Sequence, residues 1–198
     1  MKIIGITGGV GSGKSRVLSF MNKEYGAVIC QADHVAWELQ TPGNICYNMI
    51  TDYFGVEVLN TDGTIDRREL GKRVFSDNEE LVVLNNIMHP AVKEKVLEII
   101  KEEQKKHTEI FVLEAALLLE EHYDEICDEI WYIYAKEDVR RHRLRESRQY
   151  SEEKIDAIMN TQLSEEIFKQ KCNVIIDNTG EFEDTCYQIE NAMRGEVK

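Results

Sequence analysis

Residues 6–15 read ITGGVGSGKS, and Gly8–Ser15 within them satisfy the phosphate-loop pattern G-x-x-x-x-G-K-[ST]. The β-branched run Lys2–Ile6 before the loop predicts a strand, and apolar residues at helical spacing after it predict a helix. In that context glycines let backbone N–H groups close around phosphate oxygens, and the helix N-terminus adds positive potential. A nucleoside triphosphate is therefore the expected ligand.

The side chains of the loop have separate expected roles. Lys14 is expected to reach the β- and γ-phosphates, and the Ser15 hydroxyl to ligate Mg²⁺. The alternative is a glycine-rich turn that happens to contain Lys-Ser. A dinucleotide-binding loop is excluded, because the sequence does not fit G-x-G-x-x-G. The predicted nucleotide-binding residues here are Gly8, Gly9, Gly11, Ser12, Gly13, Lys14, Ser15 and Arg16.

Four further short apolar runs predict strands, and helical stretches separate them. Buried strands that alternate with helices form parallel sheets covered on both faces. The expected fold class is therefore α/β, with a parallel five-stranded sheet flanked by helices. The four runs are Ala27–Cys30, Ile110–Leu113, Ile130–Tyr134 and Val174–Ile176.

Two long stretches without a strand interrupt this pattern, at residues 33–107 and 136–171. The first contains only predicted helices, and the second begins with six of the 24 Lys and Arg residues within 13 positions. No internal repeat or proline-rich linker separates them from the rest. We therefore expect a single folding unit, with a core made of residues 1–32, 108–135 and 172–198. The helical pieces of the first stretch are Asn44–Phe54, Arg67–Phe75 and Val92–Gln104.

A phosphate loop does not by itself fix a reaction, since GTPases, motors, ABC-type ATPases and small-molecule kinases all carry one. Residues Asp177–Gly180 match the D-x-x-G switch pattern of GTPases, but no N-K-x-D motif exists, and we interpret the match as a turn. Two helical insertions in a short core favour an enzyme that closes over two substrates, because phosphoryl transfer must exclude water.

Length, composition and charge limit the remaining functions. The chain has 198 residues, of which 42% are hydrophobic and 31% charged, as in a globular protein with one core. A formal net charge of -13 repels polyanions, so no nucleic-acid partner is expected. Five scattered cysteines without a C-x-x-C pair and the lack of a long apolar segment predict a cytoplasmic protein without a membrane partner. We expect a monomer or a weak homo-oligomer.

Three residues outside the loop are candidates for chemistry. Asp33 follows the second predicted strand and is placed to accept a proton from an acceptor hydroxyl, although a helix N-cap is an equal alternative. Glu114 closes an apolar strand where it could hold a metal-bound water, or be a solvated or core-paired glutamate. His89 before Pro90 could contact a ligand or belong to the turn that starts the next helix.

Arginines gather at the start of the second helical stretch, among them Arg140, Arg143 and Arg148. Charged runs on helices are usually solvated faces paired with acids such as Glu137 and Asp138. In a chain of charge -13, however, concentrated arginine indicates an anionic partner, and we expect at least one of these to face phosphate.

Six segments spread over nearly the whole chain resemble the dephospho-CoA kinase family, P-loop enzymes that phosphorylate the 3′-hydroxyl of the ribose of dephospho-CoA. The stretch from Asp62 to Leu81, with its spacing to His89-Pro90, is more discriminating than the phosphate loop. The segments are Ile6–Ser15, Ala32–His34, Asp62–Leu81, Leu84–Val92, Leu117–Glu120 and Val174–Gly180.

This resemblance implies a P-loop kinase-like core, a helical CoA-binding region at 33–107 and an arginine-bearing lid at 136–171. It makes Asp33 the general base, Lys14 and Arg143 phosphate clamps, and Arg67 and His89 residues that bind the substrate. The implied reaction converts dephospho-CoA and ATP into coenzyme A and ADP, with Mg²⁺ held by Ser15 and Glu114. Gly180 is expected near the adenine, and Arg148 to replace a lid arginine where the chain has Ser147.

Two alternative functions remain at this point. The first is a kinase of another small hydroxyl compound or nucleoside, with the same core and a different acceptor site. The second is a nucleotide-binding regulatory protein without catalysis, suggested by Gln31, Ser147 and Ile158, where the family usually has an acid and two arginines.

Overall fold

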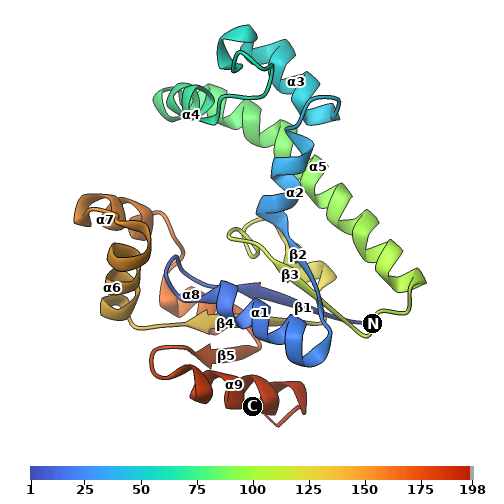
Figure 1. Cartoon of the computed structure of the whole chain (residues 1–198), viewed down its shortest axis with the longest axis vertical. Helices are drawn as coiled ribbons and strands as arrows, with labels where there is room; N and C mark the ends of the chain where they lie inside the picture. Colours follow the sequence, from blue (N-terminus) through green and yellow to red (C-terminus); the bar gives the residue numbers. More distant parts are fainter. Residues whose placement is uncertain (197–198) are drawn as a thin grey trace. The chain divides into compact units, whose positions relative to one another are not determined.

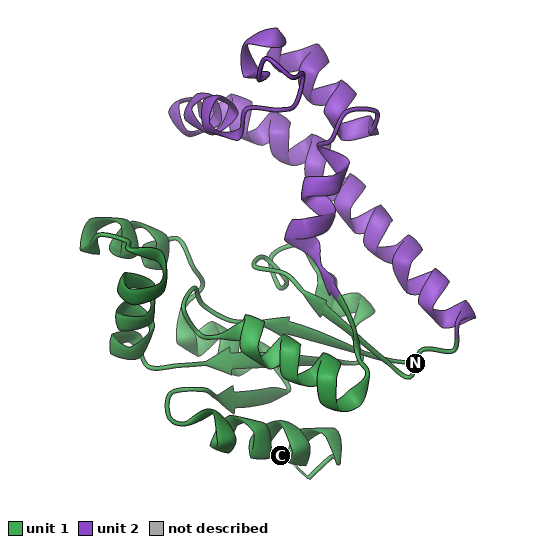
Figure 2. Cartoon of the chain, viewed as in Figure 1, with its two compact units in different colours: residues 1–29, 107–198 green, residues 30–106 purple. Residues whose placement is uncertain are grey.

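The computed structural model describes residues 1–196, and its helices and strands are labelled in Figure 1. The chain folds as two compact units (Figure 2). One consists of residues 1–29 together with the chain from His107 onward, and the other of residues 30–106. The predicted helical region 33–107 covers nearly the same residues as the second unit, and its role in binding a substrate stays a prediction.

The first unit is built on a five-stranded parallel sheet with the strand order β2-β3-β1-β4-β5. The predicted α/β fold is confirmed, and every strand boundary lies within one residue of its predicted place. β1 lies in the middle, paired in parallel with β3 on one side and β4 on the other. The strands are β1 (Lys2–Thr7), β2 (Val28–Gln31), β3 (Ile110–Glu114), β4 (Glu129–Tyr134) and β5 (Val174–Asp177).

Helices cover both faces of this sheet. α1 (Lys14–Tyr25) and α9 (Phe182–Met193) pack their apolar residues into one core with Ile4, Trp131 and Ile176 of the strands. Tyr132, which alternates with Trp131 and so faces the other way, stacks on Phe168 of α8 (Glu165–Lys171) with ring centroids 4.7 Å apart. Strands buried on both faces explain why their sequences are continuous apolar runs.

The remaining helices of this unit follow β4. They are α6 (Glu137–Arg148) and α7 (Glu152–Asn160), and a short 3₁₀ helix, η2 (Tyr123–Ile126), lies before β4. The serine hydroxyls of Ser151 and Ser164 cap α7 and α8 by accepting from backbone N–H groups three residues later. These caps mark where α7 and α8 begin, whereas α6 begins without a side-chain cap.

The second unit is helical, as predicted. Its apolar faces pack around the long helix α5, which buries Ile87, Val92, Val96 and Ile100. The only β pairing outside the sheet in residues 1–196 is an isolated bridge between Leu59 and Ile65. The elements are α2 (Ala32–Leu39), α3 (Ile45–Phe54), η1 (Val56–Val58), α4 (Arg67–Ser76) and α5 (Asn78–Lys105).

The structure excludes one of the two alternatives left open at each of two positions in this unit. The turn considered at His89-Pro90 is absent, because α5 runs through Pro90 without ending. A proline inside a helix loses one hydrogen bond, and here buried residues on both sides, Met88 and Val92 among them, hold the helix together. Asp33 is not an N-cap either, since α2 begins at Ala32 and its N-cap position is Gln31. Within residues 1–196, no helix has the length and apolarity needed to cross a membrane.

Candidate active site

The phosphate loop joins β1 to α1 in a conformation that only glycine adopts easily. Gly11 and Gly13 have φ values of 79° and 92°, in the left-handed region. A Cβ atom at Gly8 would lie 2.4 Å from the backbone oxygen of Ile133, and one at Gly13 would lie 2.2 Å from Nδ2 of Asn178. The glycines therefore serve both the backbone conformation of the loop and its close approach to β4 and to the turn after β5.

Lys14 lies across the loop. Its Nζ atom donates a hydrogen bond to the Gly8 oxygen at 2.8 Å and is 3.7 Å from Oε1 of Glu114. Only 16% of the Lys14 side chain and 10% of the Glu114 side chain are exposed. Glu114 ends β3 in register with Ile6, which places its carboxylate beside the loop. Glu114 is therefore paired with Lys14, which was one of the alternatives considered from the sequence. Its role in holding a metal ion stays a prediction.

Ser15 and Arg16 occupy the exposed first turn of α1. The Arg16 guanidinium stacks on the Phe182 ring, 3.8 Å from its centroid. Among the described residues no group of three or more His, Cys, Asp or Glu side chains could hold a metal ion. Mg²⁺ in nucleotide sites is usually held by one or two protein oxygens together with phosphates and water, and the Ser15 hydroxyl and the Glu114 carboxylate are such hard oxygen donors.

Of the three arginines considered as phosphate-facing, Arg140 and Arg143 contact the loop, and Arg143 does so beside Ser12. Its Nη1 atom lies 3.4 Å from the Ser12 oxygen, and its Nη2 atom donates to the Asn178 oxygen at 2.9 Å. Arg148 lies exposed at the end of α6, with its guanidinium 5.9 Å from the Tyr150 ring. Gly180 is exposed in the turn after β5, two residues beyond Asn178.

Three further residues hold the loop from outside: Arg140, which the sequence offered among the phosphate-facing arginines, and Asn178 and Gln162, which we did not assign to the site. Asn178, which is 4% exposed, donates from Nδ2 to the Ser12 oxygen at 2.7 Å. Arg140 donates from Nε to the Val10 oxygen at 2.9 Å, and Gln162 accepts from the Val10 N–H at 3.2 Å. Arg140 belongs to the arginine cluster and Asn178 to a family segment, whereas Gln162 belongs to neither, and each contact joins residues more than 100 positions apart.

The predicted substrate residues belong to the second unit. Asp33 is exposed in the first turn of α2, one helical turn before Trp37. The Arg67 guanidinium, at the start of α4, lies 4.3 Å from the centroid of the Trp37 ring, which is 53% exposed. His89 is half-buried within α5. Arg67 thus packs against the helix that carries Asp33.

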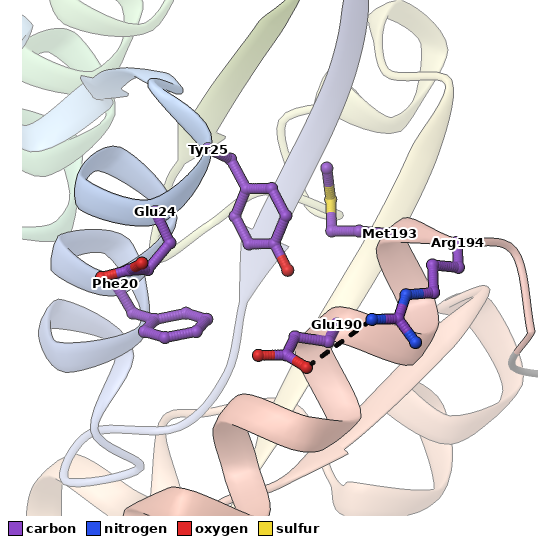
Figure 3. Close-up of a pocket in the computed structure, with 6 residues that line it drawn as sticks. All are labelled: Phe20, Glu24, Tyr25, Glu190, Met193 and Arg194. Carbon is purple, nitrogen blue, oxygen red and sulfur yellow. Dashed lines mark ion pairs between the residues drawn. The ribbon is translucent and has the colours of Figure 1, made fainter.

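A separate pocket of about 500 Å³ lies between the C-terminal half of α1 and the end of α9 (Figure 3). It is lined by two aromatic rings, by Met193 and by two carboxylates, of which Glu190 lies 4.0 Å from Arg194. Because α1 rises about 1.5 Å per residue, its lining residues Phe20 to Tyr25 lie about 9 to 16 Å along the helix from Lys14 at the phosphate loop. The carboxylates of the pocket disfavour a triphosphate, which leaves the loop as the nucleotide site.

Comparisons with known proteins identify the family of this chain. The family model of dephospho-CoA kinase matches residues 2–184. A dephospho-CoA kinase of Carboxydothermus hydrogenoformans is 39% identical over 189 residues, which cover 96% of this chain and 91% of that protein.

Solved structures show the same fold. The dephospho-CoA kinase from Campylobacter jejuni superposes with a TM-score of 0.73 at 25% identity and covers 100% of both chains. The shikimate kinase from Acinetobacter baumannii in complex with shikimate has a TM-score of 0.56 at 11% identity, covering 98% of this chain and 94% of its own, and shows a shared P-loop kinase fold alone. With a family match over nearly its full length and a phosphate loop of the required geometry, the chain belongs to the dephospho-CoA kinase family.

Proposed function

We propose that this chain transfers the γ-phosphoryl group of ATP to the 3′-hydroxyl of dephospho-CoA, giving coenzyme A and ADP. The observation that carries the proposal is the half-buried Lys14 side chain, which contacts the Gly8 oxygen and Glu114 beside a glycine-lined loop. Its family is that of kinases, which take ATP as the phosphate donor.

On the donor side, backbone N–H groups of the loop and the positive end of α1 hold the phosphates. Lys14 and Arg143 place positive charge where the γ-phosphoryl group gains negative charge during transfer. Preorganised cations of this kind stabilise a transition state more than they stabilise the ground state. Gly180 is proposed to lie near the adenine. Arg148 is proposed to bind the nucleotide as a lid arginine, in place of the arginine that the family has at Ser147.

Magnesium is proposed as the accompanying metal. The Ser15 hydroxyl and the Glu114 carboxylate would hold it, the carboxylate directly or through water, in exchange for the present contact between Glu114 and Lys14. When bound, the ion neutralises charge on the β- and γ-phosphates.

On the acceptor side, region 33–107 is proposed to bind dephospho-CoA through Arg67 and His89. Asp33 would accept the proton of the 3′-hydroxyl. The hydroxyl oxygen then forms a bond to the γ-phosphorus, and the bond between that phosphorus and the bridging oxygen of ADP breaks. The exposed position of Asp33 leaves its carboxylate accessible to a substrate. Residues 136–171 would act as the lid that keeps water from the transferring group.

The net charge and the free cysteines of the chain support a proposal for its partners and its cellular compartment. The net charge of -13 supports a protein without nucleic-acid partners, and five free cysteines support a reducing cytoplasm. Burial raises the pKa of Cys127 and of Cys172 to about 12, so neither thiol is reactive near neutral pH. A monomer or weak homo-oligomer is proposed.

The experiment that tests this function measures coenzyme A and ADP formed from ATP and dephospho-CoA by the purified chain. Asp33→Asn keeps the size of the side chain but removes the base, and we expect turnover to fall about 10² to 10⁴-fold with ATP affinity unchanged. Asp52→Asn, on the surface of α3, is the matched control and should leave turnover as it is. Turnover like wild type in Asp33→Asn would remove Asp33 from its role, and no coenzyme A from the wild type would reject the function.

A further inference from the structure

Arg140 and Gln162 form a closed set of hydrogen bonds around Val10 in the phosphate loop. Arg140 donates from Nε to the Val10 oxygen at 2.9 Å and from Nη2 to Oε1 of Gln162 at 2.8 Å. The same Oε1 atom accepts from the Val10 N–H at 3.2 Å. Both polar groups of one loop residue are thus held by side chains from α6 and from the segment between α7 and α8.

This arrangement fixes the orientation of one peptide plane. In a trans peptide the C=O and the following N–H point in opposite directions. A Val10 oxygen held outward by Arg140 therefore turns the Gly11 N–H the other way, toward the inside of the loop. Gly11 has a φ of 79° and no side chain to restrain it, so this peptide would flip at little cost without an external partner.

Two glycines beyond those of the motif leave room for the arginine. A Cβ atom at Gly9 would lie 2.3 Å from Nη2 of Arg140, and one at Gly11 would lie 2.8 Å from its backbone oxygen. Neither position has to be glycine in G-x-x-x-x-G-K-[ST]. The loop sequence therefore fits the contact with Arg140 as well as the contact with phosphate.

The surroundings of Arg140 make this contact firm. Its side chain is half-buried and lines a pocket of about 220 Å³ with Tyr132, Phe168 and Gln162. Burial lowers the pKa of Arg140 from its ordinary value, with Tyr132, Glu137 and Glu165 acting in the opposite direction. A charged group in such a site forms stronger hydrogen bonds than one in water.

We propose that Arg140 is a positioning residue for nucleotide binding: with Gln162 it orients the Val10–Gly11 peptide so that the Gly11 N–H faces the phosphates. The inference rests on the proposed function only in that the ligand is a nucleoside triphosphate. A direct contact between Arg140 and phosphate is the competing explanation, and the experiment below separates the two.

The primary test measures dissociation constants of ATP, ADP and AMP by calorimetry for wild type, Arg140→Ala and Arg141→Ala. We expect Arg140→Ala to bind ATP and ADP about tenfold more weakly, as for the loss of a hydrogen bond to a charged group, and AMP less than about twofold more weakly. Arg141, whose pKa is raised by hydrogen bonds to Glu137 and Asp156, is the matched control and should change no constant. ATP affinity like wild type in folded Arg140→Ala would overturn the inference.

A double-mutant cycle with Gln162→Ala separates positioning from direct contact. If Arg140 acts through the loop together with Gln162, the double variant binds ATP about as weakly as Arg140→Ala alone. Fully additive losses would show that Arg140 acts without Gln162 and would reject the positioning role.

Arg140→Lys keeps the positive charge but not the forked geometry of the guanidinium. It replaces Arg140→Ala in the binding measurements if Arg140→Ala does not fold. We expect it to lose most of the same ATP affinity, and affinity like wild type would reject the role. These measurements need no acceptor. A wild type that binds ATP but forms no coenzyme A would therefore reject the proposed function and leave this inference standing.

Discussion

The two units present their candidate residues in different ways. In the sheet unit, Gly8, Ser12 and Glu114 are buried, and the loop is held by hydrogen bonds from α6 and from the turn after β5. In the helical unit, Asp33 and Arg67 are exposed side chains on helix surfaces. If the proposed site residues are correct, donor binding depends on backbone geometry fixed by distant contacts, whereas acceptor binding depends on single side chains.

This difference predicts how substitutions behave. A change around the phosphate loop should affect nucleotide binding and turnover together, because the loop and its contacts act as one structure. A change on the exposed helices should affect the acceptor alone. Substitutions in each unit test whether the effects on nucleotide binding and on acceptor binding are separate in this way. They follow from the largest expected effect to the smallest.

Lys14→Ala is expected to have the largest effect. Removing the cation over the loop should lower turnover about 10³-fold, near the upper end for the loss of one preorganised charge contact. Steady-state kinetics at saturating ATP and dephospho-CoA measure it, with Lys23→Ala, an exposed pair with Glu24 on the same helix, as the control. A loss smaller than about tenfold would show that the loop works without its lysine.

Arg143→Ala is expected to lower turnover about 10²-fold, because Arg143 contacts the loop at the Ser12 oxygen, next to the motif residues Gly13 and Lys14. Arg141, two residues earlier on α6, pairs with Glu137, Glu152 and Asp156 and should change turnover little. Parallel turnover measurements on the two variants give the answer. Equal effects of the two substitutions would contradict a phosphate role for Arg143.

Arg67→Ala tests the helical unit and should have the smallest effect on the reaction. The KM for dephospho-CoA is expected to rise about tenfold, as for one lost charged contact, while ATP affinity stays the same. Trp37 fluorescence reports binding locally, since Trp37 is 53% exposed and Trp131 is fully buried. Arg68→Ala is the neighbouring control. An effect of Arg67→Ala on ATP affinity would break the distinction between the units.

The sequence predicted the strands well because each is a short apolar run ended by polar residues or glycine, a purely local signal. It likewise placed the phosphate loop, whose eight residues carry their own conformational requirement. It failed at Pro90, where tertiary packing of α5 overrides a local helix breaker. For Asp33, the sequence did not decide between a general base and a helix N-cap. The N-cap was excluded only by the structure, in which α2 begins at Ala32.

The contacts that hold the loop were beyond reach of sequence reasoning. Arg140 differs from Arg141 only in the face of α6 on which it lies, and that face is fixed by the burial of Leu144. Nothing local marks Asn178 as a partner of Ser12. Such pairings depend on the sheet order, which brings β4 and β5 to the same side of β1.

The hydrogen bond from Asn178 to the Ser12 oxygen joins residues 166 positions apart and has a consequence for biogenesis. The loop is synthesised before β5, so it acquires Asn178 as a partner only when β5 and the turn after it have been made. Until then the Ser12 oxygen lacks this hydrogen bond. Once the last strand docks, ligand and polypeptide stabilise each other by linkage, so occupancy by nucleotide favours the completed chain over any C-terminally truncated product.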